Sequence, residues 1–100
     1  MYNEGKGVPQ DYKSAVKWFS LAAEQGDADA QCNLGVMYEE GKGVPQDYVR
    51  AHIWFSIAVI SGDKNASKSR DIVANKMTPS QIKEAQKLAH ECVRKKYEGC

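Results

Sequence analysis

Three serines of this chain stand three residues before a lysine, a spacing that can place a nucleophile beside a base on one face of a helix. The pairs are Ser14 with Lys17, Ser61 with Lys64, and Ser80 with Lys83. The same S-x-x-K spacing opens the active site of penicillin-binding enzymes, which S-D-N and K-T-G motifs complete. Neither companion motif occurs in the sequence. We therefore expect local structural roles, with Ser80 in the first turn of a helix.

A second stretch with possible chemistry is the phrase EGKGVPQDY, in which two glycines flank a lysine. It occupies residues 4–12 and returns unchanged at residues 40–48. A phosphate-binding P-loop needs G-x-x-x-x-G-K-[ST] between a strand and a helix, so that lysine and hydroxyl reach the phosphates and the magnesium. No Ser or Thr follows Lys42, and no strand pattern precedes it. The phrase is instead predicted to be a turn.

Histidines and cysteines are too few and too scattered to predict a metal centre. No C-x-x-C or H-x-x-x-H spacing joins His52 or His90 to the cysteines. Fourteen basic and thirteen acidic residues are interspersed along the chain, so no basic stripe is available to follow a nucleic-acid backbone. No apolar run approaches the roughly 18 residues that span a bilayer. We predict no cofactor, no nucleic-acid partner and no membrane insertion; no signal peptide is recognisable, and the compartment stays open.

Sliding the chain by 36 residues reveals an internal repeat. From Met1 with Met37 to Asp27 with Asp63, 18 of the 27 aligned pairs are identical. Such a period is typical of stacked supersecondary units, each of which buries its apolar face against a neighbour. Two runs of apolar and small residues, spaced by three and four, indicate two antiparallel helices per unit. The first run is Ala30, Leu34, Gly35, Met37 and Tyr38, and the second is Tyr48, Ala51, Trp54, Phe55 and Ala58.

The repeated phrase falls between these two predicted helices. The first helix is expected to end near Glu40, because Gly41 can adopt the positive φ that terminates helices at low cost. Gly43 supplies a second such joint. Asp47 then stands where an N-cap residue should, its carboxylate accepting hydrogen bonds from free N–H groups of the second helix. In the earlier copy, Asp11 takes the same place.

At this point the complete unit resembles a Sel-one-like repeat (SLR), a branch of the tetratricopeptide-like helical repeats. The matching residues are Ala30, Leu34, Gly35, Tyr38, Gly41, Gly43, Val44, Asp47, Ala51, Trp54, Ala58 and Gly62. The resemblance implies an all-α fold, an α/α superhelix in which antiparallel helix pairs stack as a right-handed solenoid. It also implies a scaffold or adaptor that binds proteins. We expect three segments: a partial repeat with a truncated first helix at residues 1–28, a complete repeat at 29–63, and a divergent terminal helix pair at 64–100.

The third unit departs from the family pattern. Arg70 and Asp71 stand where Leu and Gly are expected, and no further G-x-G-V loop follows. Thr78, Pro79 and Gln81 instead form a strong helix start with a capping box. This last helix is predicted to end at Gly99 and to close the solenoid with one polar face, and it resembles the closing segment of bacterial members. Its expected apolar face is Ile82, Ala85, Ala89, Cys92, Val93 and Tyr97.

Two cysteines near the end raise the question of a disulfide. Cys92 and Cys100 have the spacing that the disulfide-bridged branch of the family uses, and the resemblance implies a bridge between them. One continuous helix would hold their Cα atoms about 12 Å apart, which is too far for a bridge unless the chain folds back at Gly99. Cys32 is expected to be a small buried or half-buried hydrophobe.

A binding surface is expected on the concave wall that the first helices of the units form, since helical solenoids bind partners there. Asn33 is the strongest candidate on it, because an Asn inside a helix gains little locally and can hydrogen-bond a peptide backbone. Asn33 could equally be a solvated side chain or bond to the neighbouring repeat. The predicted surface comprises Asp29, Cys32, Asn33, Val36, Glu40, Asn65, Lys68, Ser69, Ile72 and Lys76.

Three functions remain open at this stage. The first is a protein-binding scaffold without catalysis; the second is a hydrolase of the β-lactamase type, because a cysteine-rich branch of the family carries that description. The third is a purely structural cap of a longer array. In the 36-residue register Met1 and Tyr2 end a helix whose earlier turns are missing, so Trp18 and Phe19 lack part of their cover. We therefore expect a fragment of a longer array, or self-association through this open end. Trp18 and Trp54 themselves are expected to be core wedges.

Overall fold

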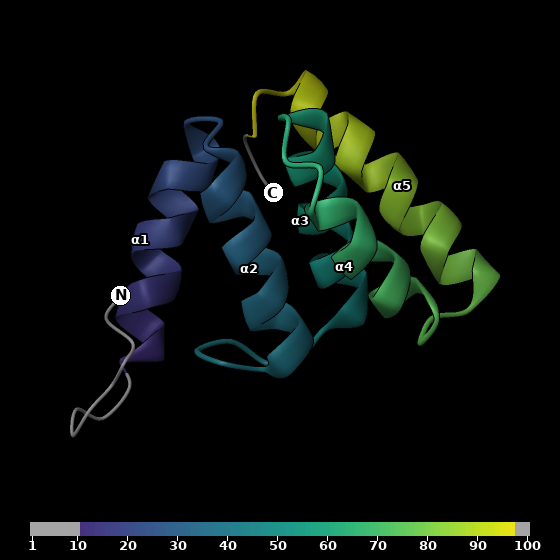
Figure 1. The fold of residues 1–100 in the computed structure, drawn as a ribbon, viewed down its shortest axis with the longest axis horizontal. Helices are drawn as coiled ribbons and strands as arrows, with labels where there is room; N and C mark the ends of the chain where they lie inside the picture. The colour runs from purple at the N-terminus through teal and green to yellow at the C-terminus, as the bar shows by residue number, and fades with distance from the viewer. Residues whose placement is uncertain (1–10, 98–100) are drawn as a thin grey trace.

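The computed structural model describes residues 11–97, and these residues form five α-helices and no strand. The helices follow one another across the molecule in chain order, as Figure 1 shows. This architecture confirms the all-α helical repeat solenoid. The helices are α1 (Tyr12–Glu24), α2 (Ala28–Glu40), α3 (Tyr48–Ile60), α4 (Ala66–Ala74) and α5 (Pro79–Arg94).

The predicted helix starts are confirmed by their capping hydrogen bonds. Asp11 and Asp47 each accept a hydrogen bond from the backbone N–H three residues on, at 3.1 Å and 3.0 Å. Thr78 and Gln81 exchange the two bonds of a capping box. Each side chain satisfies a donor that the first turn of a helix leaves free.

The loop between α2 and α3 explains the glycines and the lysine of the repeated phrase. Gly41 and Gly43 adopt φ values of +70° and +80°, as expected for two left-handed joints. Lys42 places its Nζ 3.3 Å from Glu40 and 5.3 Å from the centre of the Tyr12 ring. The lysine therefore ties the loop to its own helix end and to the preceding unit.

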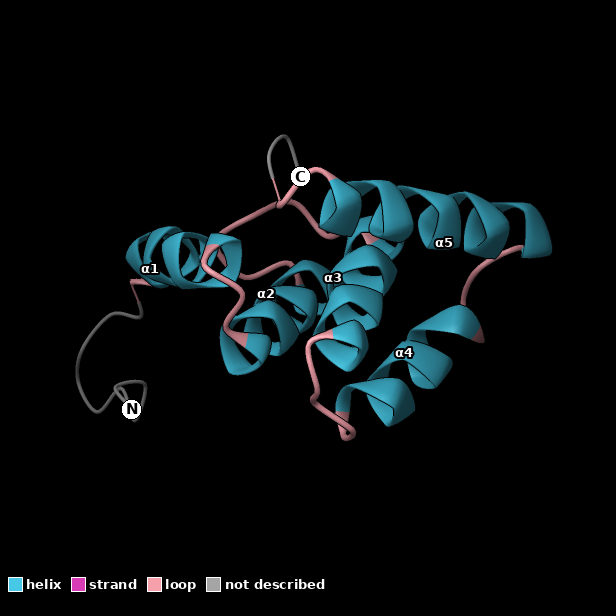
Figure 2. Cartoon of the chain, turned by 90° about the horizontal axis from the view of Figure 1, so that it is seen from above, coloured by secondary structure: helices cyan, strands magenta, loops and turns pink. Residues whose placement is uncertain are grey.

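Helix α3 is central to the packing, because its side chains enter both apolar clusters. The first cluster joins Trp54 and Ile57 to buried residues of α1, α2 and α5. The second joins Ala51, Phe55 and Ala58 to buried residues of α4. Figure 2 shows the consequence: α5 lies along one side of α3 and α4 along another. Between α1 and α2, buried Gln31 donates a hydrogen bond of 3.0 Å to the carbonyl oxygen of Ala23.

The two tryptophans that occupy equivalent positions in the repeat have different surroundings. Trp54 is 5 % exposed, as expected for a wedge in the core, whereas Trp18 is 68 % exposed. The core assignment of Trp18 was therefore wrong. Helix α3 packs against α2, α4 and α5, whereas α1 packs closely against α2 alone among the described helices. Phe19, the neighbour of Trp18, is half-buried against the first cluster.

The last helix ends earlier than expected. Ala85, Ala89 and Cys92 are buried on its inner face, as predicted, but α5 ends at Arg94 and not at Gly99. Lys96 and Tyr97 adopt left-handed φ values of +56° and +67°, and they turn the chain out of the helix. The separation of about 12 Å expected for a continuous helix therefore does not apply. Cys100 lies outside the described residues, and its bridge to Cys92 stays a prediction.

Candidate functional site

The three S-x-x-K serines lie at helix ends, where each has a structural position. Ser14 donates its hydroxyl hydrogen to Asp11 over 2.9 Å, next to the N-terminus of α1. Ser61 is the C-cap of α3, and Ser80 is exposed in the first turn of α5, as expected. Within residues 11–97, none of them forms a hydrogen bond with its lysine. Nothing at these positions assembles a nucleophile and a base.

The described part of the chain holds no group of three His, Cys, Asp or Glu side chains arranged for a metal ion. None of its helices combines the length and the apolar character needed to cross a membrane. His52 and His90 have different environments: His52 is buried in α3, and His90 is exposed on α5.

The predicted concave surface lies along α2 and α4, and none of its ten residues is fully buried. Asp29, Asn33 and Glu40 are exposed on α2, while Cys32 and Val36 are half-buried where they pack against the second cluster. On the α4 side, Lys68 and Ile72 are exposed and Ser69 is half-buried. Asn65 and Lys76 flank α4, just outside its ends.

The surface carries opposite charges on its two helices. Asp29 makes the α2 side acidic, with Glu40 paired to Lys42 at the end of that helix, and Lys68 makes the α4 side basic. Lys76 is partly engaged, since its Nζ lies 4.0 Å from a Glu39 oxygen and 5.5 Å from the centre of the Tyr48 ring. This pair and ring contact link the end of α4 to α2 and to the start of α3.

Cys32 is a protonated thiol at neutral pH. Burial raises its pKa above the usual range, and the negative charge of Asp63, a hydrogen bond with that carboxylate and the charge of Asp29 raise it further. A thiol rather than a thiolate is a poor nucleophile. Cys32 therefore fits the small, half-buried hydrophobe expected from the sequence.

Asn33 has no structural task in the described part of the chain. Its side chain is exposed in the middle of α2, and no residue between 11 and 97 forms a hydrogen bond with it. Of the two structural explanations, a bond to the neighbouring repeat is absent here. The amide is open to solvent and to a partner.

Sequence comparison resolves the family of these helix pairs. The Sel1 repeat model matches residues 1–27 and 28–63, which together make up more than half of the chain. The chain belongs to the Sel1 repeat family. Sel1 repeats and the SLR fold are generally protein-interaction modules, and typically they are non-catalytic scaffolds. No curated protein matches the chain significantly.

A solved structure has the same fold. It is a protective antigen of uropathogenic Escherichia coli strains that displays an SLR fold. It is similar to this Sel1 repeat chain with a TM-score of 0.83 and 34% sequence identity, over 94% of this chain. The match spans only 21% of the antigen's own length.

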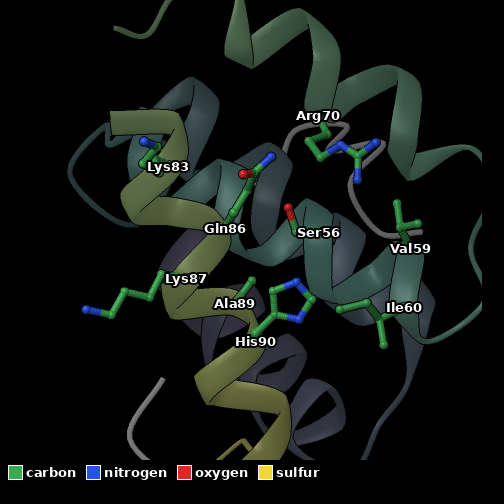
Figure 3. A pocket seen from close by; sticks show the side chains of 9 residues that line it. All are labelled: Ser56, Val59, Ile60, Arg70, Lys83, Gln86, Lys87, Ala89 and His90. Carbon is green, nitrogen blue, oxygen red and sulfur yellow. The ribbon is translucent and has the colours of Figure 1, made fainter. Parts of the chain in front are cut away.

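One feature absent from the sequence-based predictions is a pocket that lies between α4 and α5 and is also lined by residues of α3. It measures about 500 Å³, and Figure 3 shows the side chains that line it. The lining residues are Ser56, Val59, Ile60, Arg70, Lys83, Gln86, Lys87, Ala89 and His90. A signal was present, because Arg70 replaces the leucine of the repeat pattern. The sequence therefore showed that Arg70 departs from the pattern, but it did not show that Arg70 would line a pocket.

Proposed function

We propose that this Sel1 repeat chain is an adaptor that binds a peptide or protein, without catalysis, on the face formed by α2 and α4. The observation that carries the proposal is the exposed Asn33 amide, which has no partner within the described residues and stands between the half-buried Cys32 and Val36. An amide offers both a donor and acceptors, and these match the backbone groups of an extended peptide. The acidic α2 side and the basic α4 side would set the orientation of such a peptide.

Replacing Asn33 with alanine is expected to weaken peptide binding by about two- to tenfold, the value of one hydrogen bond or two. Alanine also favours the helix, so the fold should remain intact. Peptides selected on the immobilised chain by phage display would be titrated into the wild type and the variant by calorimetry, with circular dichroism to check helicity. Lys13→Ala, on the exposed side of α1, is the control. Unchanged affinity in Asn33→Ala would move the binding surface elsewhere.

We further propose that the chain self-associates through α1. Trp18 and Leu21, 68 % and 52 % exposed, form an apolar face one turn of the helix long. Soluble monomers tend to avoid such faces, and a second copy can cover the face by a two-fold contact. Trp18→Ser should therefore lower the weight-average molar mass that analytical ultracentrifugation measures at high micromolar concentration, while Lys17→Ser should not. A wild-type chain that sediments as a monomer under these conditions would refute the contact.

A further inference from the structure

The pocket between α4 and α5 exists because these two helices do not close on each other as α2 and α3 do. Both α4 and α5 pack closely against α3, but neither packs closely against the other. In the complete repeat, by contrast, α2 and α3 are in close contact, with the Phe55 ring lying directly on Gly35. The last helix pair is therefore an open version of the repeat.

The residue register explains why this pair stays open. Arg70 is 36 positions after Leu34, which is 1 % exposed in the core. Counted from the N-caps Asp47 and Thr78, the positions of Trp54 and Phe55 in α3 correspond to those of Ala85 and Gln86 in α5. A guanidinium, a methyl group and an amide thus stand where a leucine and two aromatic rings fill the complete repeat. The last pair has lost the apolar seam and has gained polar groups in its place.

The lining of the pocket is basic and contains no acidic side chain. Arg70, Lys83 and Lys87 contribute its cationic groups, with exposed His90 beside them. Within residues 11–97, no carboxylate lies within 4.0 Å of Lys83 or Lys87, and Arg70 has only a long 3.8 Å contact between its Nε and Asp71. Lys83 and Lys87 are four residues apart on one helix, an unfavourable arrangement for two like charges. An anion would relieve it.

The interior of the pocket combines polar groups with an apolar wall. In Figure 3, the Arg70 guanidinium and the Gln86 amide flank Ser56, whereas the Lys87 amine points outward. Ser56 is buried, with its Oγ 3.3 Å from His52 Nδ1. Burial lowers the pKa of His52, and the charge of Arg70 lowers it further, so His52 is neutral near pH 7 and adds no positive charge. Val59, Ile60 and Ala89 supply the apolar wall, on which Ile60 is 48 % exposed.

We propose that this pocket binds a carboxylate on an aliphatic stem, presented as an acidic side chain of a partner peptide. The planar fork of Arg70 suits the two oxygens of a carboxylate, and Gln86 can donate a further hydrogen bond. The aliphatic stem would lie against Ile60 and Val59. The proposal does not depend on the surface of α2 and α4. The pocket opens between α4 and α5, and its lining contains none of the ten residues of that surface.

The test uses matched peptides and calorimetry. Acetyl-Leu-Glu-Leu-Glu-amide should bind the wild type, and the peptide with Gln in place of Glu should bind about tenfold more weakly or worse. Arg70→Gln should reduce the affinity for the acidic peptide by a similar factor. Arg94→Gln, which removes the same charge from an exposed position on α5, should change it by less than about twofold. Backbone amide shifts of the wild type should move at Ser56, Arg70 and Gln86 on addition of the acidic peptide.

Further measurements keep the result decisive. If Arg70→Gln loses helicity, Lys83→Gln serves as a second variant and should also weaken binding of the acidic peptide. Equal binding of the two peptides, or an equal loss in Arg94→Gln, would overturn the proposal. Free glutarate that binds as tightly as the peptide would identify a small dicarboxylate rather than a partner protein. Tighter binding of inorganic phosphate would likewise rule out a site selective for carboxylates.

Discussion

Gly35→Ala is expected to lower the free energy of unfolding by about 1–3 kcal/mol, as an overpacked core position does. A Cβ atom on Gly35 would lie 2.5 Å from Cε1 and 2.6 Å from Cδ1 of Phe55. The Phe55 ring is fully buried between α2 and α4, so it has no free space to move into. In an exposed helix the same change would stabilise the helix by roughly 1 kcal/mol. A loss of stability in Gly35→Ala would therefore indicate the close contact with the Phe55 ring.

A double-mutant cycle provides the control for this expectation. Phe55→Leu leaves a smaller side chain opposite Gly35, and in that background Gly35→Ala should cost much less or become favourable. Chemical denaturation of the four proteins measures the coupling between the two positions. A loss of stability that is the same in both backgrounds would show that the Phe55 ring does not limit residue 35.

Gly43→Val is expected to destabilise the chain by at least the roughly 1–3 kcal/mol that a strained left-handed residue costs. Its φ is +80°, and an added Cβ would lie 2.6 Å from the carbonyl oxygen of Tyr12. Backbone cannot move aside as cheaply as the end of a side chain, so the clash adds to the strain. A loss of about 1 kcal/mol lowers the melting temperature by roughly 4–8 °C in a domain of this size.

Gly62→Val separates strain from clash. Gly62 has a φ of +113°, but no atom lies within 4 Å of its added Cβ. The valine there meets no neighbouring atom, so the fall in the melting temperature of Gly62→Val reports the strain of a positive φ without a clash. A melting temperature within a degree of the wild type's in Gly43→Val would contradict both the strain and the clash.

The features that could be predicted from the sequence are those that depend on neighbouring residues. Local sequence alone predicts two N-caps and two left-handed residues, because each depends on the residue type at its own position and on the next few residues. These are the caps Asp47 and Thr78 and the glycines Gly41 and Gly43. The period then arranges the helix pairs. The early end of α5 had no such signal, because Lys96 and Tyr97 adopt a conformation that residues other than glycine seldom take.

The features that could not be predicted depend on what packs over a helix. Trp18 and Trp54 share a position in the repeat, yet α3 is covered by three helices and α1 closely by one. Likewise, the sequence shows that Arg70 departs from the repeat pattern. The pocket can be inferred only when the position of Arg70 in α4 is considered together with the positions of Ala85 and Gln86 in α5. The spacing of residues in the sequence indicates which residues share a face of one helix, whereas this pocket is lined by residues of three helices.

The double role of α3 implies an order in which parts of the chain can open. Because α1 contributes to the first cluster alone and α4 to the second alone, either helix can detach while the opposite cluster stays closed. Helix α3 has buried residues in both clusters, and α2 also has residues packed in both, so the amides of these two helices become accessible only when both clusters have come apart. Brief openings at the two flanks would thus leave the α2–α3 pair closed, and this pair would set the lifetime of the whole fold.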